Sequence, residues 1–73
     1  MSAIFLTDCE RVLLREIADP QMKRRDVAIT YRLSMAAWAR NDEEIDWRKV
    51  NEAIIARWSR SALEWIKREA HKP

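Results

Sequence analysis

The chain contains no glycine among its 73 residues. Glycine adopts a positive φ without a steric cost, and tight hairpins and phosphate-binding loops depend on that freedom. Its absence argues against a multi-stranded β fold, a P-loop and a Gly-rich dinucleotide site. The sequence therefore favours an all-α chain whose helix ends are held by polar caps.

The composition restricts how so short a chain can be stabilised. One Cys and one His can form neither an internal disulfide nor the four-ligand set of a closed zinc site. We therefore expect no cofactor and no metal, and a single helical domain over residues 1–73 that is stabilised by packing. The lone Cys fits a reducing compartment, which predicts a cytoplasmic protein. No apolar run approaches the roughly 20 residues of a membrane span.

Two breaks divide the chain, one at Asp19-Pro20 and the other at residues 41–46. They predict a compact bundle of three main helices, over about residues 8–19, 21–40 and 47–70. The apolar stripe of the third region rotates near residues 59–61. This rotation predicts either a kink or a fourth helix that begins there.

Polar residues stand at each expected helix start. Thr7 with Glu10, and Ser61 with Glu64, have capping-box spacing. Asp19 precedes Pro20, and Asp46 precedes Trp47, as N-caps do.

Apolar residues at helical spacing predict the core. Its expected members are Leu13, Ile17, Val27, Tyr31, Trp38, Trp47, Val50, Ile54, Trp58 and Trp65. Region 21–40 is apolar on a second side as well, through Met22, Ile29, Leu33 and Ala36. A helix apolar on two sides is either sandwiched between neighbours or is two shorter helices.

No residue set typical of an enzyme is present. The only His is third from the end of the chain, and Cys9 lies on an apolar stripe. Nucleophilic catalysis needs a nucleophile, a base and an orienting group. The carboxylates of residues 42–46 lack the spacing of a Ca²⁺ loop and predict a solvated connection. We therefore expect a non-enzymatic protein.

The apolar helical surface exceeds what a bundle of this size can cover. Some of it is expected to pack against a second copy or another protein, which predicts a self-associating interaction module. The candidate interface residues are Tyr31, Met35, Trp38, Trp58, Trp65 and Ile66.

An alternative comes from residues 25–34, Arg-Asp-Val-Ala-Ile-Thr-Tyr-Arg-Leu-Ser. This segment resembles the first helix and turn of a helix-turn-helix DNA-binding motif, which implies a recognition helix over residues 35–41. Arg32 departs from the pattern, because glycine is usual at that turn. The resemblance implies a small DNA-binding regulator with candidate contacts at Arg24, Arg25, Arg32, Arg40 and Asn41.

Charge is distributed unevenly along the chain. Residues 1–46 carry seven basic and nine acidic residues, whereas residues 47–73 carry seven basic and three acidic ones. This polarity either steers a partner or suits the dipoles of the helix ends.

Overall fold

The computed structural model describes residues 9–72, and over these residues the chain is helical apart from its connections. The all-α prediction is confirmed. The second predicted region is one continuous helix, and the third is two helices that separate at Trp58 and Ser59. The helices are α2 (Cys9–Ala18), α3 (Arg24–Ala39), α4 (Trp47–Arg57) and α5 (Arg60–Ala70).

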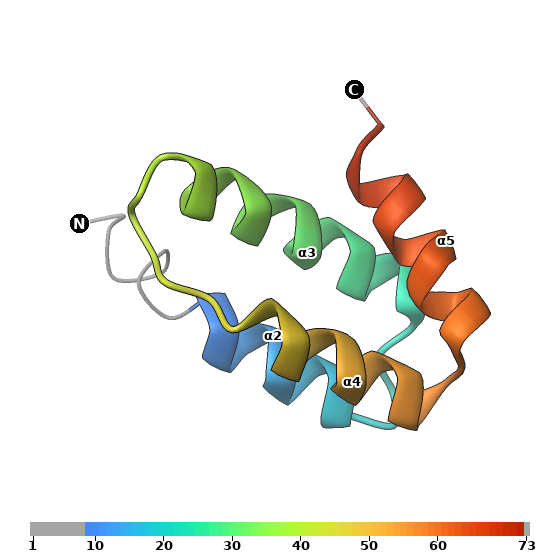
Figure 1. Ribbon diagram of the computed structural model, residues 1–73. Coiled ribbons are helices and arrows are strands. Elements are labelled where there is room, and N and C mark those ends of the chain that lie inside the picture. The colour runs from blue at the N-terminus through green and yellow to red at the C-terminus, as the bar shows by residue number, and fades with distance from the viewer. Residues whose placement is uncertain (1–8, 73) are drawn as a thin grey trace.

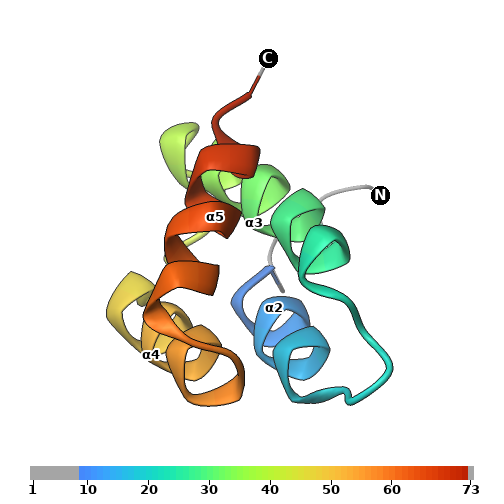
Figure 2. The same cartoon turned by 90° about the vertical axis from the view of Figure 1, so that its right-hand side faces the viewer.

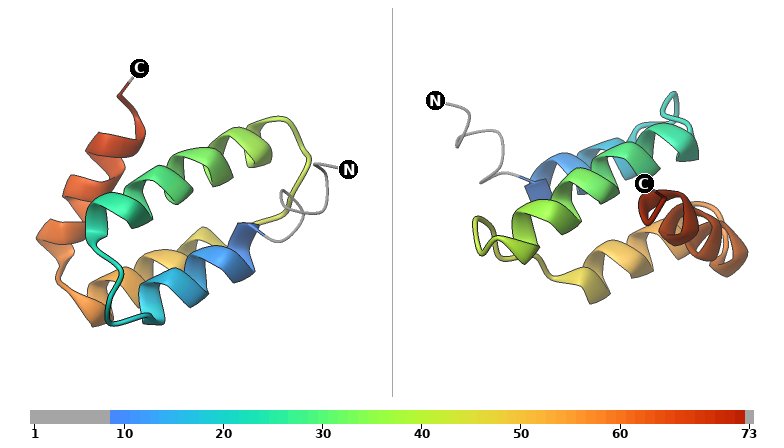
Figure 3. Two further views of the ribbon diagram at one scale, coloured as in Figure 1. Left: turned by 180° about the vertical axis from the view of Figure 1, so that it is seen from behind. Right: turned by 90° about the horizontal axis from the view of Figure 1, so that it is seen from above.

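The four helices close into a ring around a common core. Helices α2 and α4 lie side by side and run in the same direction, and α3 runs the opposite way above them (Figure 1). Seen from the side, α2 and α4 form a lower layer beneath α3 and α5 (Figure 2). Helix α5 stands upright against the others, so that it is seen nearly end-on from above (Figure 3).

The core is formed by apolar residues from all four helices. The buried members of the predicted core are Leu13, Ile17, Val27, Tyr31, Val50 and Ile54. Helix α5 adds Leu63 and Ile66, and alanines lie where helices approach closely. Full burial of one Leu, Ile or Val contributes about 1.5–3 kcal/mol to the free energy of unfolding.

The tryptophans depart from the predicted core. Trp47, Trp58 and Trp65 are partly buried and pack against it, whereas Trp38 is 52% exposed, so its assignment to the core is wrong. Trp38 lies in the last turn of α3, where its ring packs edge to face on Trp47 and borders an apolar hollow.

The second apolar side of α3 is neither sandwiched nor split. Ile29 is 54% exposed and Leu33 is 43% exposed, on an uninterrupted helix. Both readings that the sequence offered for this side are therefore wrong, because no neighbouring helix covers it among residues 9–72.

At the helix starts, one predicted N-cap is confirmed and two are wrong. Asp46 Oδ1 accepts the Lys49 N–H at 3.2 Å, as predicted. Helix α5 is capped by Ser59, whose Oγ accepts the Ala62 N–H at 3.1 Å, and not by Ser61. Thr7 lies outside the described residues.

Asp19 caps a turn rather than a helix. Its Oδ1 accepts the Gln21 N–H at 2.9 Å, and its carbonyl accepts the Met22 N–H at 3.1 Å. Lys23 is extended, with φ −93° and ψ 154°, so α3 begins at Arg24 rather than near residue 21.

Helix α3 ends at an asparagine in place of glycine. Asn41 has φ 61°, its N–H donates to the Trp38 carbonyl, and the Asp42 N–H donates to the Ala37 carbonyl at 2.9 Å. These two bonds define a Schellman motif. Asparagine takes this left-handed position because its short polar side chain tolerates it better than other side chains do.

Arg57, the last residue of α4, binds the end of α2 and the connection that follows it. Its Nη1 lies 2.8 Å from the Ile17 carbonyl oxygen, and its Nη2 lies 3.0 Å from that of Met22. The last carbonyls of a helix have no intrahelical donor, so this guanidinium satisfies groups that would otherwise need water. The full set of carbonyl acceptors belongs to Glu16, Ile17, Asp19, Pro20 and Met22.

Replacing Arg57 with alanine is expected to lower the free energy of unfolding by about 2 kcal/mol, because several partly buried carbonyls lose a charged donor. Arg57→Lys should recover only part of this loss, since an ammonium cannot reach carbonyls spread over the same arc. Urea unfolding followed by far-UV circular dichroism measures both. Exposed Arg60, changed to Ala, is the matched control, and equal losses for Arg57→Ala and Arg60→Ala would contradict the assignment.

Candidate functional site

The sequence-predicted interface residues separate into core and surface. Ile66 is fully buried and Tyr31 is 4% exposed, so Ile66 belongs to the core and Tyr31 contributes at most an edge to a surface. Met35, Trp58 and Trp65 are partly buried. Trp38 is the large aromatic side chain of this set that stands exposed.

An apolar hollow of about 270 Å³ surrounds Trp38. Tyr31, Met35 and Trp38 share one side of α3, because residues four and seven apart align on a helix. Trp47, at the start of α4, packs against two of them. Its ring centroid lies 4.8 Å from that of Tyr31 and 6.5 Å from that of Trp38, the latter edge to face. We call this hollow the aromatic groove; its lining residues are Tyr31, Met35, Trp38, Ala39, Trp47 and His71.

The sequence identified only half of the aromatic groove. Three of its members follow from the spacing along α3, but Trp47 and His71 come from α4 and from the residue after α5. No local signal joins them to α3, because their positions depend on how the helices pack. The adjacent Asp46 holds the start of α4 in place, since its N–H donates to Glu10 Oε1 of α2 at 2.7 Å.

The floor of the groove carries one internal hydrogen bond between helices. The Tyr31 hydroxyl donates to Asn51 Oδ1 at 2.8 Å, which links α3 to α4. Burial raises the pKa of the Tyr31 phenol above its ordinary value of 10.0. The negative charge of Glu64 adds to this increase in the pKa.

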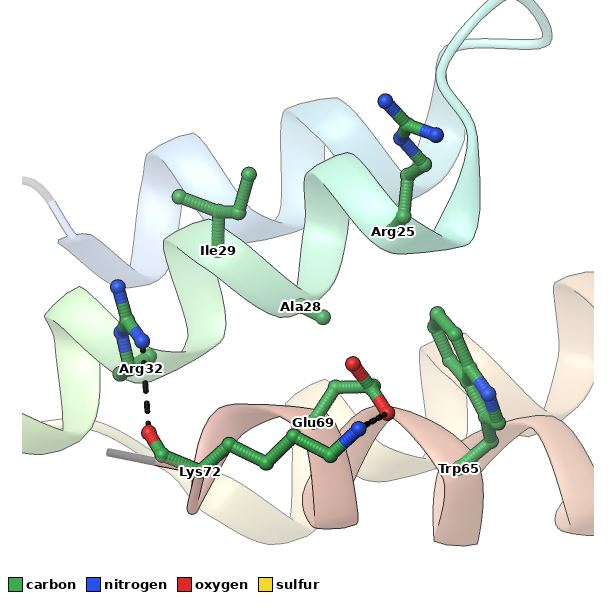
Figure 4. Close-up of a pocket in the computed structure, with 7 residues that line it drawn as sticks. All are labelled: Arg25, Ala28, Ile29, Arg32, Trp65, Glu69 and Lys72. Carbon is green, nitrogen blue, oxygen red and sulfur yellow. Dashed lines mark hydrogen bonds and ion pairs between the residues drawn. The ribbon is translucent and has the colours of Figure 1, made fainter.

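A second hollow, of about 520 Å³, lies between α3 and α5 (Figure 4). We call it the α3–α5 cleft. Arg25 and Arg32 line it from α3, and Trp65 lies across it on α5. The Arg24 guanidinium lies 5.5 Å from the Trp65 ring centroid. The lining residues are Arg25, Ala28, Ile29, Arg32, Trp65, Glu69 and Lys72.

Two polar contacts lie at the end of the α3–α5 cleft opposite Trp65. Lys72 Nζ pairs with Glu69 Oε2 at 2.8 Å, and Arg32 Nη1 donates to the Lys72 carbonyl at 3.4 Å (Figure 4). The cleft therefore combines an apolar wall with a positive rim, in which one of the cations is neutralised by Glu69.

The helix-turn-helix geometry expected at residues 25–41 is absent. Helix α3 runs without a turn through residues 32–34, and Arg32 has no positive φ. Of the expected base-reading residues, Asn41 takes the left-handed position that follows the C-cap of α3, and Arg40, the C-cap, pairs through Nε with Asp42 at 2.7 Å. A tight connection between two helices occurs instead at Trp58 and Ser59, between α4 and α5.

Three further features concern the thiol of Cys9, metal binding and membrane spans. Cys9 is buried in the core as a free thiol. Among residues 9–72, no three His, Cys, Asp or Glu side chains are grouped so as to hold a metal ion. None of the helices within the same residues is long and apolar enough to cross a membrane.

No protein-family model matches this chain, and neither a curated protein nor a solved structure matches it.

Tyr31 is the one tyrosine of the chain, so tyrosinate absorbance reports its ionisation alone. In the folded protein the absorbance midpoint is expected above that of the urea-unfolded chain, which titrates at about 10. Because the folded state holds this proton to higher pH, the free energy of unfolding should fall as pH rises past the unfolded pKa.

The predicted fall in the free energy of unfolding at alkaline pH has its own control variant. Tyr31→Phe should lose the tyrosine contribution to this alkaline destabilisation, and should cost about 0.5–1.5 kcal/mol near neutral pH through the lost Asn51 bond. A folded midpoint equal to or below the unfolded one is the result that contradicts the burial of the phenol.

Proposed function

We propose that this chain is a non-enzymatic helical interaction module that self-associates in the cytoplasm through the aromatic groove. The observation that carries the proposal is Trp38, which is 52% exposed beside an apolar hollow. An exposed aromatic side chain next to an apolar hollow is the arrangement expected of an interface anchor. The free thiol of Cys9 supports the reducing compartment.

The rigidity of Trp38 also supports the proposal. Its ring is held edge to face against Trp47, and Trp47 is in turn packed on buried Tyr31. A side chain already fixed in one position loses little conformational entropy on association. These ring contacts favour one position of Trp38 over others at the groove.

Trp38→Ala is expected to abolish or strongly weaken self-association while leaving the helical content unchanged. Sedimentation equilibrium from micromolar to millimolar protein measures the first effect, and circular dichroism the second. Truncation of a central aromatic anchor typically costs an interface 2 kcal/mol or more, about a thirtyfold loss of affinity.

The matched control is Ile29→Ala. Ile29 is 54% exposed on the same helix, outside the aromatic groove, so its truncation should leave the association constant unchanged. A chain that stays monomeric at millimolar concentration would sink the proposal. Dissociation by Ile29→Ala, with no effect of Trp38→Ala, would move the interface to the other side of α3.

Nucleic-acid binding is the second candidate, and it rests on the α3–α5 cleft. Arg24 lies over the Trp65 ring, and Arg25 and Arg32 line the cleft, although the helix-turn-helix motif that first suggested these residues is absent. Cations that contact phosphates beside an aromatic ring that stacks on a base are typical of single-stranded nucleic-acid sites.

This candidate predicts binding to a fluorescently labelled single-stranded oligonucleotide at low salt, measured by anisotropy. Affinity should fall steeply with added salt, because phosphate contacts release counterions. Arg25→Glu should weaken binding, whereas Arg15→Glu, on exposed α2 surface, should have a smaller effect. Absence of binding at low salt eliminates the candidate.

A further inference from the structure

Two further hollows each share one lining residue with the aromatic groove. The first, of about 390 Å³, is lined by the carboxylates of Glu10, Glu44 and Asp46 together with Trp38 and Ile45. We call it the acidic hollow. It shares Trp38 with the aromatic groove.

The second hollow, of about 570 Å³, is bordered by the C-terminal turn of α5. We call it the basic hollow. It shares His71 with the aromatic groove, and the His71 Nδ1 lies 2.7 Å from the Lys67 carbonyl oxygen. Its lining residues are Glu64, Lys67, Arg68, His71 and Lys72.

Each neighbouring pair of these three hollows shares a lining residue, and we call the series the band. Its order is acidic, aromatic, basic, with Trp38 at the first junction and His71 at the second. Internal pairing only partly neutralises the two ends. Glu10 lies 3.8 Å from Lys49, and Lys72 is paired with Glu69 at 2.8 Å, whereas Glu44 is exposed.

A surface with opposite charges on either side of an apolar centre is complementary to itself in one orientation. A twofold axis that lies in the interface and crosses the band at right angles, through the aromatic groove, sets each acidic hollow against the partner's basic hollow. An axis along the band would instead oppose like charges. Closed dimers bury the same patch of both copies, so every favourable contact is made twice.

We propose that the occupant of this band is a second copy of the chain, related by that crossing twofold axis. The inference rests on the self-association proposed above and specifies its geometry. The partner's Trp38 lies over the His71 side of the aromatic groove, and the partner's basic hollow faces Glu44 and Asp46. The aromatic centre supplies most of the affinity, and the charged ends select the orientation.

Two charge reversals test the geometry. In the proposed dimer, Glu44→Lys sets a lysine against the partner's Lys67, and Lys67→Glu sets a glutamate against the partner's Glu44. Each variant alone is expected to dimerise more weakly than the wild type, on the order of tenfold, because like charges now face one another. An equimolar mixture should recover dimers of near wild-type affinity, since positions 44 and 67 that face each other then carry opposite charges again.

Matched variants control for net charge. Glu52→Lys on α4 and Arg15→Glu on α2 alter exposed residues that are not part of the band by the same amounts. Sedimentation equilibrium of all four variants and of the mixture gives the association constants, and circular dichroism confirms that each variant is folded. The two controls should behave as the wild type does.

The outcomes separate this inference from the proposed function. A wild-type dimer that is indifferent to both reversals, or variants that do not rescue one another, overturns the crossing axis while self-association stands. Assembly that continues beyond the dimer also overturns it, because a closed twofold contact stops at two copies. A wild type that remains monomeric at every concentration overturns both proposals and leaves the band to another occupant.

Discussion

The guanidinium of Arg57 stabilises the corner of the bundle where the dipoles of two helices oppose their packing side by side. Helices α2 and α4 lie side by side and run in the same direction, so the negative ends of their dipoles meet at one corner (Figure 1). Arg57 places a positive charge at that corner and donates to carbonyls of α2 and of the following connection. The position of α3 depends on this contact, because the bound connection leads directly into Arg24.

The absence of glycine shapes the opposite corner, where the candidate site lies. Asn41 takes the left-handed position that ends α3 and so turns the chain downward just after Trp38. The acidic residues 42–46 then pass beside that tryptophan before α4 begins. Trp38 and the acidic residues 42–46 are neighbours because α3 ends directly after this tryptophan.

The residues of the aromatic groove could be predicted from the sequence better than their arrangement in space. The spacing of Tyr31, Met35 and Trp38 along one helix was readable, because helical periodicity is local. The burial of each residue could not be predicted, since Tyr31 is covered by the packing of helices whereas Trp38, on the same side of α3, borders a hollow. The helix-turn-helix resemblance placed a turn where α3 is continuous, and its two last candidate residues serve the end of that helix instead.

The sequence by itself determined that this chain is helical, where its two main breaks lie and which residues form the stripes of α2 and α4. These features follow from periodicity, from the Asp46 cap and from the lack of glycine, which act over a few residues. Only the tertiary structure decided that Arg57 closes the α2 end and that Trp38 stands outside the core. It alone also set acidic and basic hollows on either side of the aromatic groove, because each of these relations joins residues distant along the chain.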